Sequence, residues 1–360
     1  MRFAFLLAQR ADPKRVRPNP LVGAVLVAQN GEIVGEGFHQ QAGEGHAEVL
    51  AISDALQKNT DLSDCVLYVT MEPCSHHGKT PPCTDLILQH KIRKVVIGTM
   101  DPNPMVSGAK VLSAASVDVE FLILPELLEL NSVFNINQVY KRPKYLLKSA
   151  ITLNGKIADQ FGNSKWISNV KSRQYVHSIL RAHADAILTT AKTVIQDNAS
   201  MNIRIDGMNP EELNLIVIDR KLDLLQSNNA RLAVFYPRKN STIYLVSDQQ
   251  FSGPIKANVQ VLQVPFVNGK CDLNILSERL LEKNICEVLI EAGGVLNAHM
   301  MDAGIVDELY IFITPTIFGD PHAINLFNSQ GMQDLVHKST VELIATEHFE
   351  NDILAKYKVI

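Results

Sequence analysis

One histidine and two cysteines in the first quarter of the chain are spaced as metal ligands. His46-Ala47-Glu48 is followed by Pro73-Cys74 and, after eight intervening residues, by Cys83. One imidazole and two thiolates give a tetrahedral zinc ion three protein ligands, which leaves the fourth position open for water. Glu48 lies two residues after the histidine, where a carboxylate can move protons to and from that water. The pattern therefore predicts zinc-dependent hydrolytic chemistry.

The spacing of His46 and Glu48 sets a condition on the local structure. Residues i and i+2 of a regular helix do not share a face. We therefore expect the two side chains to converge at the start of a helix, which the two glycines just upstream favour. Two alternatives stay open: a structural zinc site with His76 or His77 as fourth ligand, and no metal at all.

The elements that must position these groups fall into two parts. A chain of 360 residues is long enough for two domains. Over residues 1–124, apolar runs alternate with helical periodicities, which predicts a layered α/β sheet. Residues 125–143 are polar and less clearly patterned, and we expect a linker there. Residues 144–360 predict a second α/β domain, with its last two strands near 340–347 and 353–359.

Charge and cysteine content narrow the partners and the compartment. The net charge is −4, and no Lys/Arg-rich stripe is interleaved with aromatics, so we expect no nucleic-acid partner. No stretch is long and apolar enough to span a bilayer, and the opening apolar run lacks a cleavage site for secretion. Five cysteines in a chain of this size do not form a disulfide framework. We expect a cytoplasmic protein without a membrane partner.

A second candidate site follows a predicted strand in the later part of the chain. Glu291-Ala292-Gly293-Gly294-Val295 opens a helix, where glycines let a ligand approach the backbone and unpaired N–H groups favour phosphate. The segment is not the G-x-G-x-x-G of a dinucleotide-binding unit. A tight turn without a ligand is the alternative.

Residues around the metal motif carry a family resemblance. In nucleobase deaminases a glutamate after the histidine is a proton shuttle, within H-x-E…P-C-x-x-C; here a longer insert separates the cysteines. The motifs are Asn19-Pro20-Leu21-Val22-Gly23-Ala24-Val25, Gly37-Phe38-His39, His46-Ala47-Glu48, Glu72-Pro73-Cys74-Ser75-His76, Gly78-Lys79-Thr80-Pro81-Pro82-Cys83 and Asp101-Pro102-Asn103-Pro104. Together they closely resemble the deaminase half of the bifunctional riboflavin-biosynthesis deaminase–reductase family.

The resemblance implies a cytidine-deaminase-like three-layer α/β/α domain and one Zn²⁺ per chain. It implies hydrolytic deamination of 2,5-diamino-6-(5-phosphoribosylamino)pyrimidin-4(3H)-one, a small phosphoribosylated pyrimidine, with Glu48 as catalytic residue. The implied zinc ligands are His46, Cys74 and Cys83, and the implied substrate contacts are Asn19, His39, Lys79, Asp101 and Asn103. Asn103 is also a good turn residue, so a plain turn is an equal alternative for it.

The later part of the chain resembles the reductase half of the same family. The matching motifs are Ala150-Ile151-Thr152-Leu153-Asn154-Gly155-Lys156, Ser164-Lys165-Trp166-Ile167-Ser168, Asp185-Ala186-Ile187 and Glu291-Ala292-Gly293-Gly294. The resemblance implies a dihydrofolate-reductase-like α/β domain that uses NADPH to reduce the ribosyl chain of 5-amino-6-(5-phosphoribosylamino)uracil to ribityl. The implied NADPH contacts are Ala150, Trp166, Thr193, Asp197, Gly293, Gly294, Val295, Leu296, Asn297, Ala298 and His299. The implied substrate contacts are Lys148, Ser164, Arg181, Met201, Arg204 and Glu291. The family also implies a homodimer or homotetramer.

Three departures from the family pattern concern the reductase half. The usual Leu-Asp-Gly-Lys has Asn154 in second position, and the usual Asp-Asp-Pro-x-Leu-Thr is replaced by the sequence of residues 197–202. The helix before Arg181 is one residue longer than usual. A deaminase with a decayed reductase half is therefore one alternative. An RNA-editing deaminase and an inactive structural zinc module are the others.

Overall fold

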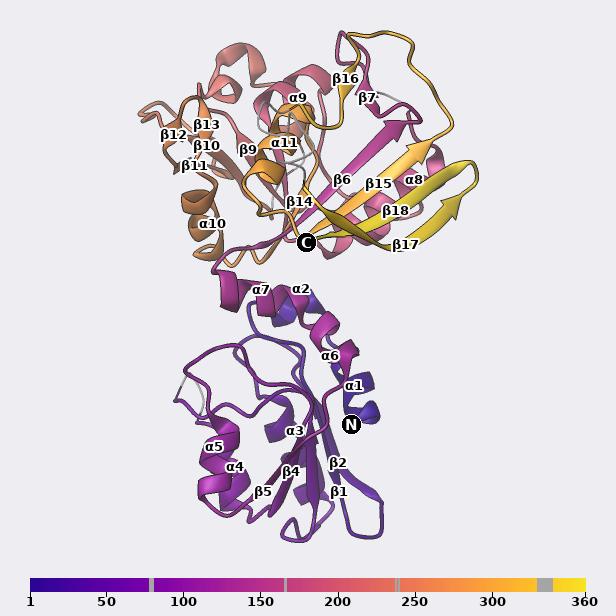
Figure 1. The fold of residues 1–360 in the computed structure, drawn as a ribbon. Helices are drawn as coiled ribbons and strands as arrows, with labels where there is room; N and C mark the ends of the chain where they lie inside the picture. The colour runs from indigo at the N-terminus through magenta and orange to yellow at the C-terminus, as the bar shows by residue number, and fades with distance from the viewer. Residues whose placement is uncertain (78–80, 165–166, 237, 239, 329–338) are drawn as a thin grey trace. The chain divides into compact units, whose positions relative to one another are not determined.

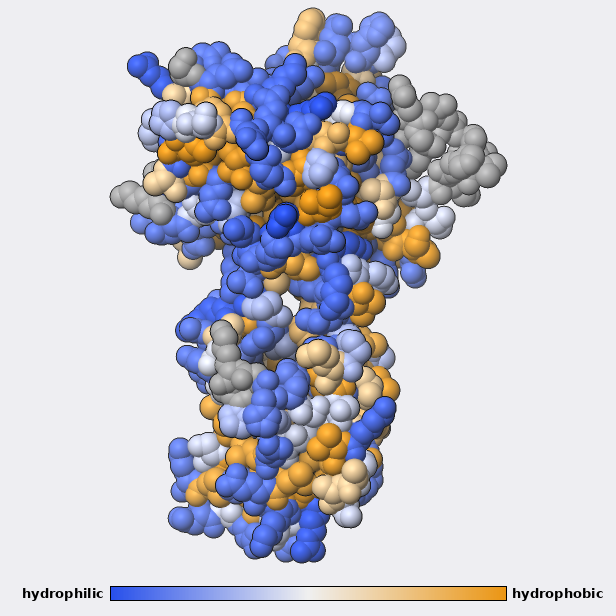
Figure 2. Space-filling view, turned by 90° about the vertical axis from the view of Figure 1, so that its left-hand side faces the viewer, coloured by the Kyte–Doolittle hydropathy of each residue, from blue (hydrophilic) through white to orange (hydrophobic). Residues whose placement is uncertain are grey.

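The chain folds into two compact units, Met1–Lys141 and Arg142–Ile360 (Figure 1). The structure is a computed structural model, and it describes residues 1–77, 81–164, 167–236, 238, 240–328 and 339–360. Among these residues, no helix is both long and apolar enough to cross a membrane. Hydrophilic and hydrophobic residues are intermixed over the face in Figure 2, as on an ordinary protein surface.

The first unit is built on a five-stranded sheet in the order β2-β1-β3-β4-β5. Strand β1 is antiparallel to β2 and β3, whereas β3, β4 and β5 are parallel. The strands are β1 (Gly23–Val27), β2 (Ile33–Phe38), β3 (Val66–Val69), β4 (Lys94–Ile97) and β5 (Asp118–Phe121), and the helices over one face are α3 (Ala47–Gln57), α4 (Cys83–Gln89) and α5 (Gly108–Ala114). Helix α1 (Arg2–Ala8) packs on the other face against Val25, and the short α2 (Pro13–Val16) follows it. The expected three-layer deaminase-like fold is confirmed.

Residues 125–143 differ from the expected linker. They form α6 (Pro125–Leu130) and α7 (Ser132–Tyr140), and they belong to the first unit up to Lys141. Leu127 is fully buried, and the Asn131 side chain both accepts from Leu21 N and donates to Leu21 O, at 2.8 and 3.0 Å. These contacts reach more than a hundred residues back along the chain, so the local pattern does not reveal them.

The second unit is built on a nine-stranded sheet in the order β11-β10-β9-β8-β14-β6-β15-β18-β17. The seven strands from β11 to β15 in that order are parallel, and β18 and β17 extend the sheet antiparallel. The strands are β6 (Lys144–Thr152), β8 (Ala186–Thr190), β9 (Asn214–Ile218), β10 (Ile243–Ser247), β11 (Val259–Gln263), β14 (Glu287–Ile290), β15 (Glu308–Thr314), β17 (Val341–Phe349) and β18 (Asp352–Val359). Two small antiparallel sheets of two strands each pair β12 (Phe266–Val267) with β13 (Lys270–Cys271) and β7 (Lys156–Ala158) with the distant β16 (Ile324–Asn325). The two expected late strands are present.

The helices of the second unit lie on opposite faces of its sheet. Helices α10 (Leu273–Leu281) and α11 (Gly294–Asp302) share a core with Leu188 and Ile290, while α9 (Ala191–Asp197) shares one with Ile187. Helix α8 (Val170–Tyr175) runs on into a π-helical turn η1 (Val176–Arg181), which packs with Leu289 on the α9 side. Helices α9 and α11 follow the adjacent strands β8 and β14 but leave on opposite faces. Such a divergence opens a crevice at the carboxyl ends of the strands, where α/β sheets bind ligands.

Candidate active sites

The three predicted zinc ligands converge in the first unit. His46 is the N-cap of α3, Cys74 follows β3, and Cys83 is the first residue of α4. His46 Nδ1 lies 3.6 Å from Cys74 Sγ and 3.3 Å from Cys83 Sγ. Tetrahedral zinc with ordinary Zn–N and Zn–S bonds separates such ligand atoms by about 3.6 Å, so the donor set fits the ion.

No fourth protein ligand joins this set in the part of the chain that the structure describes. His46, Cys74 and Cys83 form the one group there of three or more metal-binding side chains, and neither His76 nor His77 belongs to it. Three ligands leave a coordination position open, as catalytic zinc sites require. The alternative of a structural zinc site with His76 or His77 as fourth ligand is therefore not supported.

Glu48 lies beside the ligands at the start of α3. Because the N-cap His46 is extended, with φ −69° and ψ 165°, the helix begins only at Ala47, and Glu48 falls in its first turn. This is the helix start that the two-residue spacing demands. Glu48 is 4% exposed, and burial raises the pKa of its carboxyl while the charge of His46 opposes that rise. A carboxyl with a raised pKa can both accept and return a proton near neutral pH.

The two thiols have different acidities. The hydrogen bond with Cys83 lowers the pKa of Cys74 to about 4, with further help from the Cys83 backbone N–H, which lies 3.2 Å from its sulfur. The same thiol–thiol contact raises the pKa of Cys83. One thiolate is thus favoured before a cation binds, which suits a divalent metal.

Two of the predicted substrate contacts lie next to His46. Asn19 Nδ2 donates to His39 Nε2 at 3.0 Å, and His39 Nδ1 donates to the carbonyl of Gly45 at 3.1 Å. The His39 ring meets that of His46 edge-on, with centroids 5.5 Å apart. The hydrogen bonds hold His39 in one orientation against the metal ligands.

The remaining predicted substrate contacts of the first unit make hydrogen bonds within a local turn or lie outside the described residues. The Asp101 carboxylate accepts from Asn103 N at 2.8 Å, and Asn103 Oδ1 accepts from Met105 N at 3.1 Å. Both side chains therefore hold a local turn, and the plain-turn alternative for Asn103 remains open. Lys79 lies outside the described residues.

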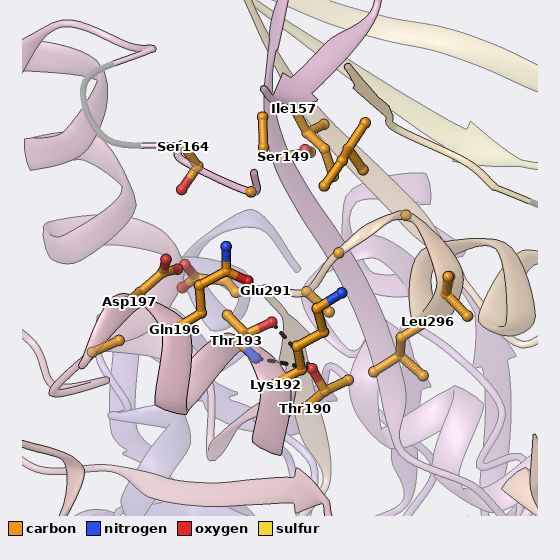
Figure 3. A pocket seen from close by; sticks show the side chains of 18 of the residues that line it. Ser149, Ile157, Ser164, Thr190, Lys192, Thr193, Gln196, Asp197, Glu291 and Leu296 are labelled. Atoms are coloured by element: carbon orange, nitrogen blue, oxygen red, sulfur yellow. Dashed lines mark hydrogen bonds between the residues drawn. The ribbon is translucent and has the colours of Figure 1, made fainter. Parts of the chain in front are cut away.

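A cavity of about 1210 Å³ opens in the second unit at the carboxyl ends of β6, β8 and β14 (Figure 3). Pockets for one drug-sized ligand are usually about 300–1,000 Å³, so this one has room for a dinucleotide and a substrate together. All six predicted substrate residues line it: Lys148, Ser164, Arg181, Met201, Arg204 and Glu291. Eight predicted cofactor residues also line it: Ala150, Thr193, Asp197, Gly293, Gly294, Val295, Leu296 and His299.

Arg181 and Glu291 form a bidentate ion pair in the cavity wall. Arg181 Nε and Nη2 donate to the two Glu291 carboxylate oxygens at 2.6 and 2.9 Å, and Nη1 donates to the carbonyl of Asn202 at 2.6 Å. Burial alone would raise the pKa of Glu291, but Arg181, together with Lys148 and His177, lowers it to about 2. Burial also lowers the pKa of Lys148. Much of the Arg181 guanidinium, a predicted substrate contact, is thus occupied by Glu291.

Two family models cover these two sites. The cytidine and deoxycytidylate deaminase zinc-binding region matches residues 1–99, and the RibD C-terminal domain matches residues 143–355. The riboflavin biosynthesis protein RibD of Actinobacillus pleuropneumoniae is 39% identical over 349 residues, which cover 95% of this chain and 90% of that protein. RibD of Escherichia coli is 34% identical, with coverage of 97% and 96%.

The chain belongs to the RibD family.

A solved RibD-type structure agrees over the whole chain. The diaminohydroxyphosphoribosylaminopyrimidine deaminase/5-amino-6-(5-phosphoribosylamino)uracil reductase of Thermotoga maritima is 33% identical, has a TM-score of 0.83, and is matched over 100% of this chain and 97% of that one. This RibD protein is therefore a bifunctional deaminase–reductase of riboflavin biosynthesis. Its two domain families imply zinc and NADPH.

Two of the predicted cofactor contacts of this RibD protein lie behind the cavity wall. Asn297 and Ala298 do not line the cavity but are 0% and 1% exposed. Asn297 Nδ2 instead donates to the carbonyl of Leu326 at 3.2 Å. A helix turns by about 100° per residue, so when Leu296 and His299 face the cavity, the two residues between them face the core. Trp166, a further predicted contact, lies outside the described residues.

His177 is a residue near this site that sequence reasoning missed. Its Nδ1 accepts from Arg204 N at 3.1 Å, and its Nε2 lies 3.4 Å from Arg204 Nη2. Burial lowers the pKa of His177 to about 4, and Arg181 and Arg204 add to the effect. A neutral imidazole can accept from an arginine, which a charged one cannot. The position four residues before Arg181 is the signal that could have indicated it.

The helix before Arg181, which we predict to be one residue longer than in the family, ends in the π-helical turn η1. A π turn adds one residue to an α-helix, and such turns often occur at functional sites. Leu180 and Arg181 are buried at the end of the turn, so the insertion does not turn the arginine away from Glu291.

Deleting the exposed Ile179 should convert this turn to α-helix and preserve the reductase. We expect kcat/KM for reduction to change by less than about tenfold, since the Arg181–Glu291 pair can re-form. Leu180→Asp is the control: it keeps the chain length but places a charge in a buried cluster, and it should unfold the second unit. Steady-state reductase kinetics and circular dichroism measure both variants; a deletion of Ile179 as damaging as Leu180→Asp would contradict this explanation of the turn.

The other departures from the family pattern keep a structural role. Asn154 Nδ2 donates to the carbonyl of Phe318 at 2.7 Å, which holds the turn after β6. Asn198 ends α9 in the left-handed conformation, with φ 44°, and its Oδ1 accepts from Ala233 N at 2.8 Å. The following segment lacks the usual proline, but the buried Arg238 donates to the carbonyls of Ser200 and Met201. The loop beside the cavity is therefore held by hydrogen bonds.

Proposed function

We propose that the first unit deaminates 2,5-diamino-6-(5-phosphoribosylamino)pyrimidin-4(3H)-one and that the second reduces the product, 5-amino-6-(5-phosphoribosylamino)uracil, at its ribosyl chain. The observation that carries the proposal is the convergence of His46, Cys74 and Cys83 beside the buried Glu48. We assign the deaminase domain to residues 1–141 and the reductase domain to residues 142–360, in line with the two compact units.

The deaminase residues divide into ligands, a proton shuttle and substrate contacts. His46, Cys74 and Cys83 would hold one zinc ion per chain, and bound zinc supplies a water activated near neutral pH. Glu48 takes a proton from the attacking water and returns it to the departing amine, which leaves as ammonia. Asn19 and His39 hold the pyrimidine against the ligands, and Lys79, Asp101 and Asn103 are proposed as further contacts on the family pattern.

The reductase residues surround the sugar and the cofactor. NADPH, when bound, supplies the hydride for the sugar C1. The backbone at Gly293 suits it, because a Cβ there would meet nothing within 4 Å and a ligand can approach closely. We assign Lys148 and Glu291, which line the cavity, to the sugar; Lys148, with its pKa lowered by burial, can hold a sugar oxygen or give it a proton. Arg204 is the freer arginine for the substrate phosphate, since Glu291 occupies much of Arg181.

Compartment and assembly complete the proposal. All five cysteines are free thiols, as in a reducing cytoplasm. A homodimer or homotetramer agrees with the edge strand β17, whose Leu343 and Ile344 are exposed. Sedimentation of the purified protein would test the assembly.

One assay tests both activities. The diamino-ribosylamino-pyrimidinone phosphate is added to purified protein, and ammonia release and NADPH oxidation are followed together. We expect both signals, with ammonia first. Ammonia without NADPH oxidation would identify a deaminase with a decayed reductase, and the absence of both signals in zinc-loaded protein would contradict the proposal.

Removing zinc should separate the two activities. Dialysis against a chelator is expected to abolish deamination, because the ligands without the metal activate no water. Reduction of the deaminated substrate should continue, since its site contains none of the three ligands. Metal content, ammonia release and NADPH oxidation are measured before and after zinc is restored. Deamination that survives in metal-free protein would contradict the zinc assignment.

A further inference from the structure

The reductase cavity extends along the sheet beyond the predicted cofactor residues. Strand register places Ile290 of β14 beside Leu147 of β6 on one side and Leu188 of β8 on the other, while Thr190 lies beside Ile218 of β9. The residues that line the cavity reach from Lys148, the residue of β6 that follows Leu147, to Ile218 at the end of β9. Three strand spacings separate these ends, about 14 Å, which is room for an extended dinucleotide.

The chemistry fixes which half of the cofactor lies at which end. Hydride transfer requires the nicotinamide next to the sugar, and hence near Lys148 and Glu291. The adenosine half must then lie toward the β9 end. There the cavity is lined by Ile218 and by Phe266 of the β12–β13 pair, which offer apolar surface to an adenine ring.

Two lysines that no predicted contact includes also line the cavity. Lys192 lies in the first turn of α9, and Figure 3 shows it reaching into the cavity beside Thr193. Lys270 is the first residue of β13, in the same pair of strands as Phe266. Within the described residues, neither lysine side chain makes a hydrogen bond or an ion pair, and both residues are exposed. Both are therefore available to an anionic ligand.

The positions of the two lysines match different phosphates. Lys192 follows β8, whose neighbour β14 leads directly into Gly293 and Gly294, so it lies between the two ends of the cavity, where the diphosphate must pass. Lys270 lies at the adenosine end with His299, which also lines the cavity. Burial lowers the pKa of His299, and the positive charge of Lys270 lowers it further.

We infer that Lys270, with His299 beside it, binds the 2′-phosphate of the adenosine and makes the reductase select NADPH over NADH. The inference rests on the proposed reductase function. Lys192 contacts the diphosphate, which both dinucleotides carry, and so contributes to affinity without contributing to selection.

Direct binding separates these two roles without turnover. The Kd values of NADP⁺ and NAD⁺ are measured by calorimetry on the full chain, with Lys270→Gln as the test variant and Lys192→Gln as the matched control. A hydrogen bond to a charged group corresponds to about a tenfold to hundredfold change in Kd. Lys270→Gln should weaken NADP⁺ by that factor and leave NAD⁺ unchanged, whereas Lys192→Gln should weaken both by the same factor. Adenosine 2′,5′-bisphosphate and AMP, as fragment probes, should repeat the Lys270 pattern.

The outcomes discriminate between the inference and the function beneath it. Unchanged NADP⁺ binding in Lys270→Gln, or an equal loss of NADP⁺ and NAD⁺, would overturn the role of Lys270. If only Lys192→Gln lost the preference for NADP⁺, the 2′-phosphate would lie at Lys192, and the proposed role of Lys270 would be overturned too. Wild-type protein that binds neither dinucleotide would contradict the reductase function itself, and this result appears before any variant is made.

Discussion

Replacing Glu48 by glutamine should reduce deamination by about 10²- to 10⁴-fold while zinc remains bound. The amide keeps the size of the side chain in its buried position in the first turn of α3 but cannot accept a proton from water or return it to the amine. The three ligands are untouched, so metal content should stay at one ion per chain. Ammonia release and metal analysis of the same preparation give the result.

A nearby glutamate provides the control for this substitution. Glu44 is exposed in the loop just before His46, and Glu44→Gln should leave deamination within about twofold, as surface changes usually do. Reduction of the deaminated substrate should be normal in both variants. Full deamination by zinc-loaded Glu48→Gln protein would contradict the role of Glu48 in proton transfer.

Glu291→Gln should both inactivate the reductase and destabilise the second unit. The carboxylate holds Arg181 with two hydrogen bonds, and both side chains are largely buried, at 13% and 9% exposed. Removing one member of a buried pair leaves the other charge uncompensated and costs about 3–5 kcal/mol. For a unit of this size we expect the melting temperature to fall by on the order of 10 °C, measured by calorimetry of the full chain.

The pH dependence and a surface pair test the cause of that loss. The pKa of Glu291 is lowered from 4.5 to about 2, so its stabilising effect is complete above pH 4.5 and is lost as the pH falls toward 2. The difference between wild type and variant should shrink over that range. Glu282 pairs with Arg279 at the surface, where both are more than half exposed, and Glu282→Gln should cost less than about 1 kcal/mol. Equal losses in the two variants would contradict the argument from burial.

The metal site could be predicted from the sequence because its ligands and the neighbouring glutamate belong to short sequence motifs. The residue types and the two-residue spacing of His46 and Glu48 require a helix start, and His46 is the N-cap of α3. The sheets could be predicted for a similar reason, since most of the buried strands are rich in apolar residues. Both signals are local.

What could not be predicted depends on contacts between distant residues. Arg181 and Glu291 are 110 residues apart, and no pattern near either one indicates that they pair. The burial of Asn131 against Leu21 likewise makes helices of a segment that looks like a linker. The burial of Asn297 could not be predicted either, because a whole segment was carried over from the family, although a helix presents only some of its residues to one side.

Among the described residues, no buried cluster contains residues of both units. The large cluster of the first unit contains residues between Ala24 and Val117, and the three large clusters of the second unit contain only residues after Arg142. A mutation that unfolds one core should therefore leave the other catalytically competent. Two defective alleles, one damaged in each half, should then complement each other when expressed in the same cell, because the first enzyme's released product is the second's substrate. In genetic terms, a single gene of this kind should behave as two cistrons.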